Sequence, residues 1–304
     1  MLLISSPRFQ EHTTPPGHPE RPERAEVFDV LAAAWRDRGG RVVEPRPASD
    51  EELLRVHDAA HVEAIARTRG RAAKLDPDTF TSPESYEIAL LAAGAAVQAA
   101  EHALDTREPA VALVRPPGHH AERDQAMGFC LFNNVAVAAG AALARGLSRV
   151  AIVDIDVHHG NGTQWIFYAE PRVLYVSTHQ FPFYPGTGAA TETGSGAGHG
   201  FTFNIPLAAG AGDADYAKAY AAVATRLEEY APELLLISAG YDAHADDPLA
   251  SMRVTTDGYR EIVRILRDAA ARIGCPLALV TEGGYDLDAL GACLAATLEV
   301  LTEI

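Results

Sequence analysis

Short runs of consecutive aliphatic residues alternate along the chain with longer segments in which alanine and leucine recur at helical spacing. The short runs are apolar at every position, so they predict strands that are buried on both faces. The predicted strands are 110–114, 150–154, 173–177, 201–204, 234–238 and 277–281. The predicted helices are 86–104, 133–145, 213–230, 256–273 and 287–301, with Asp213, Thr256 and Asp257 as expected N-caps. This alternation predicts an α/β fold with a central, mainly parallel β-sheet flanked by helices on both faces.

The same pattern bears on domain organisation. No linker, internal repeat or low-complexity segment divides the 304 residues, so we expect a single domain over 1–304. The stretch 181–200 is dense in Gly, Thr and Pro and directly follows a predicted strand. Because it is too long for a simple turn, we interpret it as a functional loop.

Composition and charge restrict the kind of partner. The chain has 25 Lys and Arg against 41 Asp and Glu, a formal net charge of -16. Nucleic-acid binding relies on clustered Lys and Arg, so we expect no nucleic-acid partner, and a cationic ligand suits the chain better. Cys130, Cys275 and Cys293 are odd in number and lack paired spacing, which favours a cytoplasmic protein. No apolar run reaches the ~18 residues that span a bilayer and no export signal is evident, so we expect no membrane partner.

Polar side chains gather directly after four of the predicted strands. They are His119 and His120 after the first strand, Asp154, Asp156 and His158 at the end of the second, Asp242 after the fifth and Tyr285 after the sixth. Each of them alone could cap a helix or stabilise a turn. Because the carboxyl ends of parallel strands share one edge of a sheet, where α/β proteins place ligands, the combination favours a functional site.

The chemistry of this edge suggests a metal. Asp154, Asp156 and His158 occupy alternate positions, so extended backbone directs their side chains to one face. Two carboxylates this close favour a protonated acid unless a cation neutralises them. Carboxylate and neutral imidazole are good Zn²⁺ ligands, and Asp242 can add a third from another strand, which leaves a position open for water as in a catalytic site. His159 points to the other face, and we expect a structural role for it.

Five longer motifs follow one another in order between Arg115 and Tyr285. They are Arg-Pro-Pro-Gly-His119-His120-Ala-Glu, Gly128-Phe129-Cys130-Leu-Phe-Asn-Asn, Asp154-Ile-Asp-Val-His-His-Gly-Asn-Gly-Thr-Gln, Ser238-Ala-Gly-Tyr-Asp242-Ala-His-Ala-Asp-Asp-Pro-Leu and Glu282-Gly-Gly-Tyr285. Together they resemble the histone deacetylase family, on its class II and bacterial side. The resemblance implies an arginase-like α/β fold and Zn²⁺-dependent hydrolysis of N-acetyl amides.

The resemblance also implies roles for residues of the reaction centre. The matches are Asp156, His158 and Asp242 for the zinc ligands, His120 for the general base and acid, His119 for its partner, Asp154 for the acid that orients His119, Asn161 for the residue that orients His120, and Tyr285 for the hydroxyl that polarises the acetyl carbonyl. Some members carry Asp where this chain has Asn161. We therefore expect His120 to lack a carboxylate partner and to be less basic than in those members.

Further matches concern the substrate and a second cation. They are Gly128, Phe129 and Tyr184 for the walls of the substrate tunnel, Arg24 for an arginine near an internal acetate channel, Asp78 for a rim residue that holds the substrate backbone, and Asp154 and Ser177 for a potassium (K⁺) site. Tyr184 stands where many relatives have Phe, so the substrate preference is open.

Several alternatives stay open beside a general deacetylase. An acetylpolyamine amidohydrolase would cleave the same amide, and the acidic composition is compatible with a polyamine. A binuclear manganese ureohydrolase would need two more acids, at positions where this chain has Gly160 and His244. A catalytically silent module that binds acetylated ligands would lack a catalytic residue, and none is missing. We expect a small-molecule or peptide acetyl-amine as substrate, and the sequence leaves open whether copies of the chain form a homo-oligomer.

Overall fold

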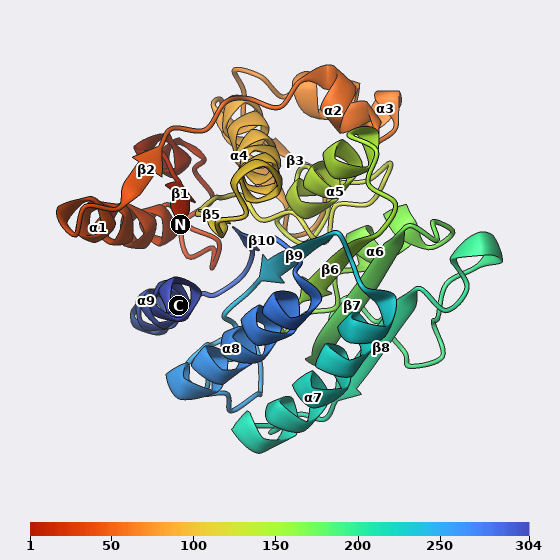
Figure 1. Cartoon of the computed structure of the whole chain (residues 1–304). Coiled ribbons are helices and arrows are strands. Elements are labelled where there is room, and N and C mark those ends of the chain that lie inside the picture. Colours follow the sequence, from red (N-terminus) through yellow and green to blue (C-terminus); the bar gives the residue numbers. More distant parts are fainter. Residues whose placement is uncertain (304) are drawn as a thin grey trace.

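The computed structural model of the protein describes residues 1–303, which form a layered α/β fold (Figure 1). Eight strands make one sheet in the order β2-β1-β5-β10-β9-β6-β7-β8, and every neighbouring pair is parallel. The strands nearest the two ends of the chain, β1 and β10, therefore lie in the same sheet. The predicted fold class, a central and mainly parallel sheet between helices, is confirmed.

The bounds of the elements follow. The strands of the large sheet are β1 Leu2–Ile4, β2 Arg41–Val43, β5 Ala110–Ala112, β6 Val150–Asp154, β7 Val173–Gln180, β8 Thr202–Leu207, β9 Leu234–Ala239 and β10 Leu277–Thr281. A separate antiparallel pair consists of β3 Ala73–Lys74 and β4 Phe80–Thr81. The helices are α1 Glu23–Asp37, α2 Asp50–Leu54, α3 Ala59–Ala66, α4 Ser85–Thr106, α5 Asn134–Ala144, α6 Asn161–Phe167, α7 Asp213–Tyr230, α8 Thr256–Ile273 and α9 Leu287–Thr302, with 3-10 turns at Pro7–Glu11 and Gly196–Gly198.

Successive residues of the central strands enter two different cores, one on each face of the sheet. In β6, Val150 and Ile152 pack with α4 and α5, whereas Ala151 and Val153 pack with α7, α8 and α9. Figure 1 shows these two helical layers on either side of the sheet. The continuous apolar runs are explained by this arrangement, because each strand has a dry environment on both faces.

The predicted elements are all present: β6, β10, α7 and α8 have the predicted bounds, and the others have shifted ends. The strand β5 stops at Ala112, two residues earlier than expected, and β7 continues to Gln180. The first 83 residues contain short strands and helices that the sequence pattern did not predict. No helix within 1–303 combines the length and the apolar character that a membrane span requires.

The predicted caps were wrong. Helix α8 has Thr255 as its N-cap, and the Thr255 hydroxyl accepts the Gly258 N–H at 3.1 Å. Thr256 and Asp257 are helical residues. Asp213 is the first helical residue of α7, not its cap, and its carboxylate accepts the Thr255 N–H at 2.8 Å and the Thr255 hydroxyl at 2.7 Å. The Asp213 side chain thus joins the start of α7 to the start of α8. Local sequence preference cannot predict such a contact between two helices.

Candidate active site and metal centre

The order of strands brings four polar segments to one edge of the sheet. The last two strands, β9 and β10, lie between β5 and β6. The residues that follow β9 and β10 therefore lie between the histidine pair that follows β5 and the acidic segment that follows β6. The expected convergence of these four segments is what the structure contains.

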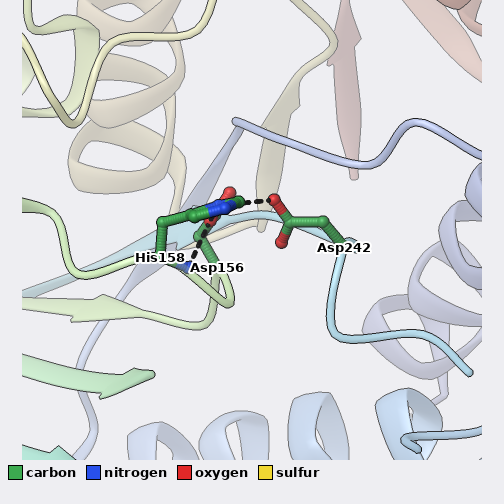
Figure 2. Close-up of side chains that lie close together, drawn as sticks. All are labelled: Asp156, His158 and Asp242. Atoms are coloured by element: carbon green, nitrogen blue, oxygen red, sulfur yellow. Dashed lines mark hydrogen bonds and ion pairs between the residues drawn. The ribbon is translucent and has the colours of Figure 1, made fainter. Parts of the chain in front are cut away.

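Asp156, His158 and Asp242 come together at the centre of this edge (Figure 2). Candidate ligand atoms from the three buried side chains all lie within 4.8 Å of one another. His158 Nδ1 is 3.1 Å from Asp156 Oδ1 and 3.1 Å from Asp242 Oδ2. Methyl groups at Gly240 and Gly283 would collide with the two carboxylates, so glycine is needed on both sides of the cluster.

Backbone donors hold the carboxylates in place. Asp156 accepts the N–H groups of His158 and Gly283, each at 2.9 Å, and Asp242 accepts the Val157 N–H at 2.9 Å. These bonds use some of the lone pairs and leave others directed at the centre of the cluster. Second-sphere contacts of this kind orient metal ligands in proteins.

The electrostatics of the cluster favour a cation. Burial disfavours charge on His158, but hydrogen bonds to Asp156 and Asp242 outweigh it and raise the pKa of His158 to about 10. Burial and the negative charge of Asp156 raise the pKa of Asp242 to about 7. Two buried carboxylates thus require positive charge between them. A set of two carboxylates and one imidazole fits Zn²⁺, which can replace a proton on such ligands.

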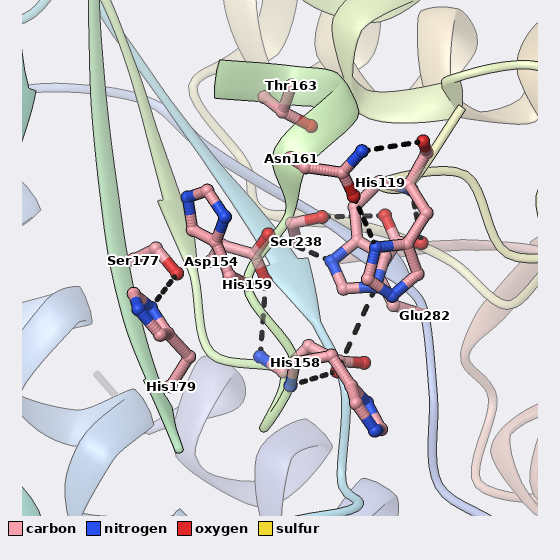
Figure 3. A network of polar contacts seen from close by, with 12 residues as sticks. His119, Asp154, His158, His159, Asn161, Thr163, Ser177, His179, Ser238 and Glu282 are labelled. Atoms are coloured by element: carbon pink, nitrogen blue, oxygen red, sulfur yellow. Dashed lines mark hydrogen bonds and ion pairs between the residues drawn. The ribbon is translucent and has the colours of Figure 1, made fainter. Parts of the chain in front are cut away.

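His119 is backed by a carboxylate. Its Nδ1 lies 3.0 Å from Asp154 Oδ2, which also accepts the Tyr175 hydroxyl at 3.2 Å. Burial lowers the pKa of His119, yet Asp154 and Asp156 overcome it and raise this pKa well above the usual range. Asp154 is therefore placed as expected, behind His119 (Figure 3).

Glu282 fixes the backbone of the same histidine and was missed by sequence reasoning. Its carboxylate accepts the N–H groups of Gly118 at 2.6 Å and His119 at 3.1 Å, and it hydrogen-bonds the Ser238 hydroxyl at 2.6 Å. Figure 3 shows Glu282 beside His119 and Ser238. Burial raises the pKa of Glu282 to about 7. The available signal was its position directly before the Gly-Gly-Tyr285 motif.

His120 is backed by an amide. The two histidine rings lie 4.0 Å apart, and His120 Nδ1 is 2.8 Å from Asn161 Oδ1. Burial, with the neighbouring His119 and His158, lowers the pKa of His120 well below its usual range. The contact between Asn161 and His120 is thus present as expected. However, a carboxylate is not missing altogether, because Asn161 Nδ2 donates to Glu122 Oε1 at 2.6 Å.

Tyr285 follows β10 at the same edge of the sheet. Its ring meets Phe129 edge-on at 5.9 Å, and the Arg24 guanidinium lies 5.1 Å from the ring centre. Burial raises the pKa of Tyr285 well above the usual range, so the hydroxyl stays protonated. Asp247 accepts the Tyr285 N–H at 2.6 Å and so fixes the backbone of this residue.

Arg24 belongs to the buried framework behind Tyr285. Its Nε donates to the Gly284 carbonyl at 2.7 Å and a second nitrogen donates to the Glu282 carbonyl. It also contacts Glu20 at 3.1 Å. The structure thus places Arg24 next to the Glu282-Gly-Gly-Tyr285 motif.

The expected tunnel residues surround the histidines and Tyr285. Gly128 has a φ of +56°, and a methyl group there would collide with the His120 ring. Tyr184 is 37% exposed and meets His120 edge-on at 5.1 Å. Phe183, which sequence reasoning did not single out, stacks on His158 at 5.4 Å. Its only signal was its place in the Gly- and Pro-rich loop.

Asp78 lies in the turn between β3 and β4. Its carbonyl oxygen is 2.9 Å from His18 Nε2, and its carboxylate accepts the Thr79 hydroxyl at 3.3 Å. The same Thr79 hydroxyl accepts the Phe129 N–H at 3.0 Å. Asp78 is therefore linked to the tunnel wall through one residue, and its role at the rim stays a prediction.

Two further expectations concern residues behind Asp154. The register of β6 and β7 pairs Asp154 with Ser177, and the Ser177 hydroxyl lies 2.8 Å from His179 Nδ1. The potassium site stays a prediction. His159 contacts the Thr187 hydroxyl at 2.7 Å and Gln164 Oε1 at 3.0 Å, which agrees with a structural role.

Comparison with known proteins is consistent with this geometry. The family model for the histone deacetylase domain matches residues 18–301. The chain belongs to the histone deacetylase family. A probable deacetylase of Methanothermobacter thermautotrophicus is 42% identical over 296 residues, covering 96% of this chain and 87% of that protein. A histone deacetylase-like amidohydrolase of Pseudomonas aeruginosa is 42% identical over 297 residues, covering 95% and 78%.

A solved structure agrees with this family assignment. The crystal structure of the HDA15 HD domain matches with a TM-score of 0.92 and 39% identity, covering 99% of this chain and 88% of that one. The family resemblance and the arginase-like fold are thereby confirmed. The names of the relatives support a hydrolase of the deacetylase and amidohydrolase type.

Proposed function

We propose that the protein is a zinc-dependent deacetylase that hydrolyses N-acetyl amides, of acetyl-lysine or related acetylated amines, to the free amine and acetate. The observation that carries the proposal is the cluster of Asp156, His158 and Asp242, with ligand atoms within 4.8 Å of one another, next to a histidine pair. Tyr285 lies at the same edge and supplies a hydroxyl that stays protonated.

The residues of the site have different roles in the proposed reaction. Zinc held by Asp156, His158 and Asp242 would supply a Lewis acid that polarises the acetyl carbonyl and lowers the pKa of water. His120 takes the proton of the attacking water and gives it to the amine nitrogen as the C–N bond breaks. Tyr285 donates a hydrogen bond to the acetyl oxygen as negative charge develops there.

The same residues favour this reaction over a ureohydrolase. A second metal would need carboxylates where Gly160 and His244 stand. Methyl groups at Gly160 would collide with Asp154 and Tyr175, so a longer acidic side chain does not fit at that position. One catalytic metal per chain is therefore the expectation.

The tunnel and its rim bear on the substrate. Phe129 and Tyr184 offer aromatic walls for an apolar stem that leads to the amide. Burial and then the negative charge of Asp78 raise the pKa of Tyr184, which supports an acidic rim near this residue. Negative charge there suits a cationic stem or peptide, so an acetylpolyamine amidohydrolase is the second candidate. We infer a small-molecule or peptide partner and no nucleic acid.

Metal analysis together with a turnover panel tests the proposal. We expect about one zinc per chain, hydrolysis of acetyl-lysine peptides or acetylated polyamines, loss of turnover with a chelator, and recovery with zinc. Asp242→Ala and His158→Ala should each lower the bound zinc. A full equivalent of zinc in both variants would refute the ligand set. Zinc without hydrolysis of any acetyl amide would favour the silent binding module, and two manganese ions with urea release the ureohydrolase.

A further inference from the structure

The amide of Asn161 lies between His120 and a carboxylate that has no assigned role. Asn161 is the first residue of α6 and is buried. Its Oδ1 is 2.8 Å from His120 Nδ1, and its Nδ2 is 2.6 Å from Glu122 Oε1. Weaker contacts join Nδ2 to Met127 Sδ at 3.3 Å and to the His120 carbonyl at 3.5 Å.

The chemistry of these groups determines which way the amide faces. An ionised carboxylate can only accept hydrogen bonds, so the NH₂ group of Asn161 must point to Glu122. The carbonyl oxygen of the amide then points to His120. Because that oxygen can only accept, His120 must carry its proton on Nδ1. The other ring nitrogen, Nε2, is then free to take a proton, and it makes no hydrogen bond to any residue from 1 to 303.

Without the carboxylate, two states of the pair would compete. An Asn161 amide turned by half a revolution would present NH₂ to His120 Nδ1 and would stabilise the tautomer with its proton on Nε2. That tautomer cannot accept a proton from water. Met127 offers only a weak sulfur acceptor on the Glu122 side, so it favours the productive orientation less than a carboxylate does.

The backbone around Glu122 holds this carboxylate where it is needed. The Glu122 N–H donates to the Gln125 carbonyl at 2.9 Å, and the Glu122 carbonyl lies 2.9 Å from His57 Nδ1. His57 is buried and also accepts the Asn133 N–H at 2.9 Å. The loop that carries His120 and Glu122 is thereby tied to the segment between α2 and α3.

We infer that Glu122 is a positioning residue for the reaction: its carboxylate fixes the orientation of the Asn161 amide, which fixes the His120 tautomer that leaves Nε2 free. The inference rests on the proposed function in so far as His120 is the base. By contrast His119 has its carboxylate, Asp154, in direct contact at 3.0 Å. The tautomer of His120 is fixed in a similar way, but its carboxylate, Glu122, acts through the amide of Asn161.

A double-mutant cycle tests this role. Glu122→Gln should lower kcat about 10-fold, within the range of roughly 10- to 100-fold seen when groups behind metal-site histidines are changed. KM and bound zinc should stay constant. In an Asn161→Asp background a carboxylate faces His120 directly, so the same Glu122→Gln change should cause no further loss, or a gain, because it removes a like charge. Asp124→Asn, an exposed acid two residues away, is the matched control and should leave kcat within about 2-fold.

The tautomer itself can be observed without turnover. In ¹⁵N-histidine-labelled protein, with His120 assigned from a His120→Ala variant, we expect the signature of the Nδ1–H tautomer in the natural chain. Glu122→Gln should give a mixture of both tautomers, and Glu122→Asp should move the signature back toward that of the natural chain. An unchanged His120 signature in Glu122→Gln, or an equal kcat loss in the Asn161→Asp background or in Asp124→Asn, would overturn the inference. If no acetyl amide is hydrolysed but the tautomer still responds, the proposed function fails and the positioning role stands.

Discussion

The two sides of the active-site edge come from opposite parts of the chain and are stabilised in different ways. The side from residues 150–301 supplies Asp156 and Asp242, two buried acids that face each other across His158. The side from residues 1–132 is anchored by another buried acid, Glu20. Its carboxylate accepts two hydrogen bonds from Arg115, each at 2.7 Å, and one from Arg24 at 3.1 Å.

The difference lies in where the balancing charge comes from. Burial would raise the pKa of Glu20, but Arg115 and His12 lower it well below the usual range. The pKa of Asp242 is raised to about 7 because burial and Asp156 both oppose its charge. Glu20 is therefore neutralised by arginine and histidine side chains of the protein, whereas the negative charge of Asp242 is opposed within its cluster, as the proposed zinc site would require.

Removing one negative charge from each side should change the free energy of unfolding very differently. Glu20→Gln leaves Arg115 and Arg24 buried without an anion and should lower the free energy of unfolding by about 3–5 kcal/mol. Asp242→Asn in chelator-treated protein should leave it unchanged or higher, because the amide oxygen still accepts the Val157 N–H and a like charge is gone. Urea unfolding of both variants gives the measurement. Equal losses in the two would show that the two acids play the same part.

Tyr285→Phe tests whether the side from residues 150–301 acts in the reaction and not in stability. Loss of one hydrogen-bond donor to a developing oxyanion should lower kcat by about 10²–10³, which is ~2.7–4 kcal/mol of barrier. Bound zinc and the unfolding midpoint should stay constant, because the Tyr285 backbone is held by Asp247. Tyr168→Phe is the matched control, since the Tyr168 hydroxyl makes no hydrogen bond within the described part of the chain. A kcat that survives Tyr285→Phe would remove this residue from the mechanism.

Acid should destabilise the side from residues 1–132 through the buried His57. Burial, and then the charge of His61, lower the pKa of His57 to about 3, against about 6.5 in an unfolded chain. The unfolded state thus gains its proton first, so this part of the stability is complete above about pH 6.5 and falls toward pH 3, by up to about 1.4 kcal/mol per pH unit. His57→Gln keeps one acceptor and one donor without titrating, and should flatten the slope of unfolding free energy against pH. The exposed His199→Gln should not, and an unchanged slope in His57→Gln would contradict the assignment.

The side from residues 150–301 could be predicted because regular strands build it. Val150–Asp154 is an apolar run with polar residues at alternate positions after it, and parallel pairing then brings Asp156 and His158 to Asp242. The alternate spacing of the polar residues and the parallel pairing of the strands are enough to predict that cluster. The sequence could not indicate which backbone amides hold it, since the Gly283 N–H comes from a loop 127 residues away from Asp156.

On the other side the histidine pair after β5 was expected, but the buried framework around Glu20 could not be predicted, for two reasons. Strands β1 and β2 have three residues each, too few for a periodic signal. Glu20, Arg24 and Arg115 are charged, and charged residues are normally expected on the surface, yet all three are fully buried because they neutralise one another over as many as 95 residues of chain. Glu122 was missed for a related reason: it follows the histidine pair in the sequence, but its contact with Asn161 arises only when α6 packs against that loop.

The smallest expected effect concerns the start of α8, where the sequence and the structure favour neighbouring residues as the cap. Thr255→Ala removes the acceptor for the Gly258 N–H and a donor to Asp213, and should cost about 1 kcal/mol of unfolding free energy. Thr256→Ala removes only a 3.3 Å contact with His244 and a weak one with Cys293, and should cost less. Both changes should leave kcat nearly constant, because the bonds that hold Asp242 and Asp247 come from other residues. A larger loss for Thr256→Ala would favour the cap expected from local preference over the one in the fold.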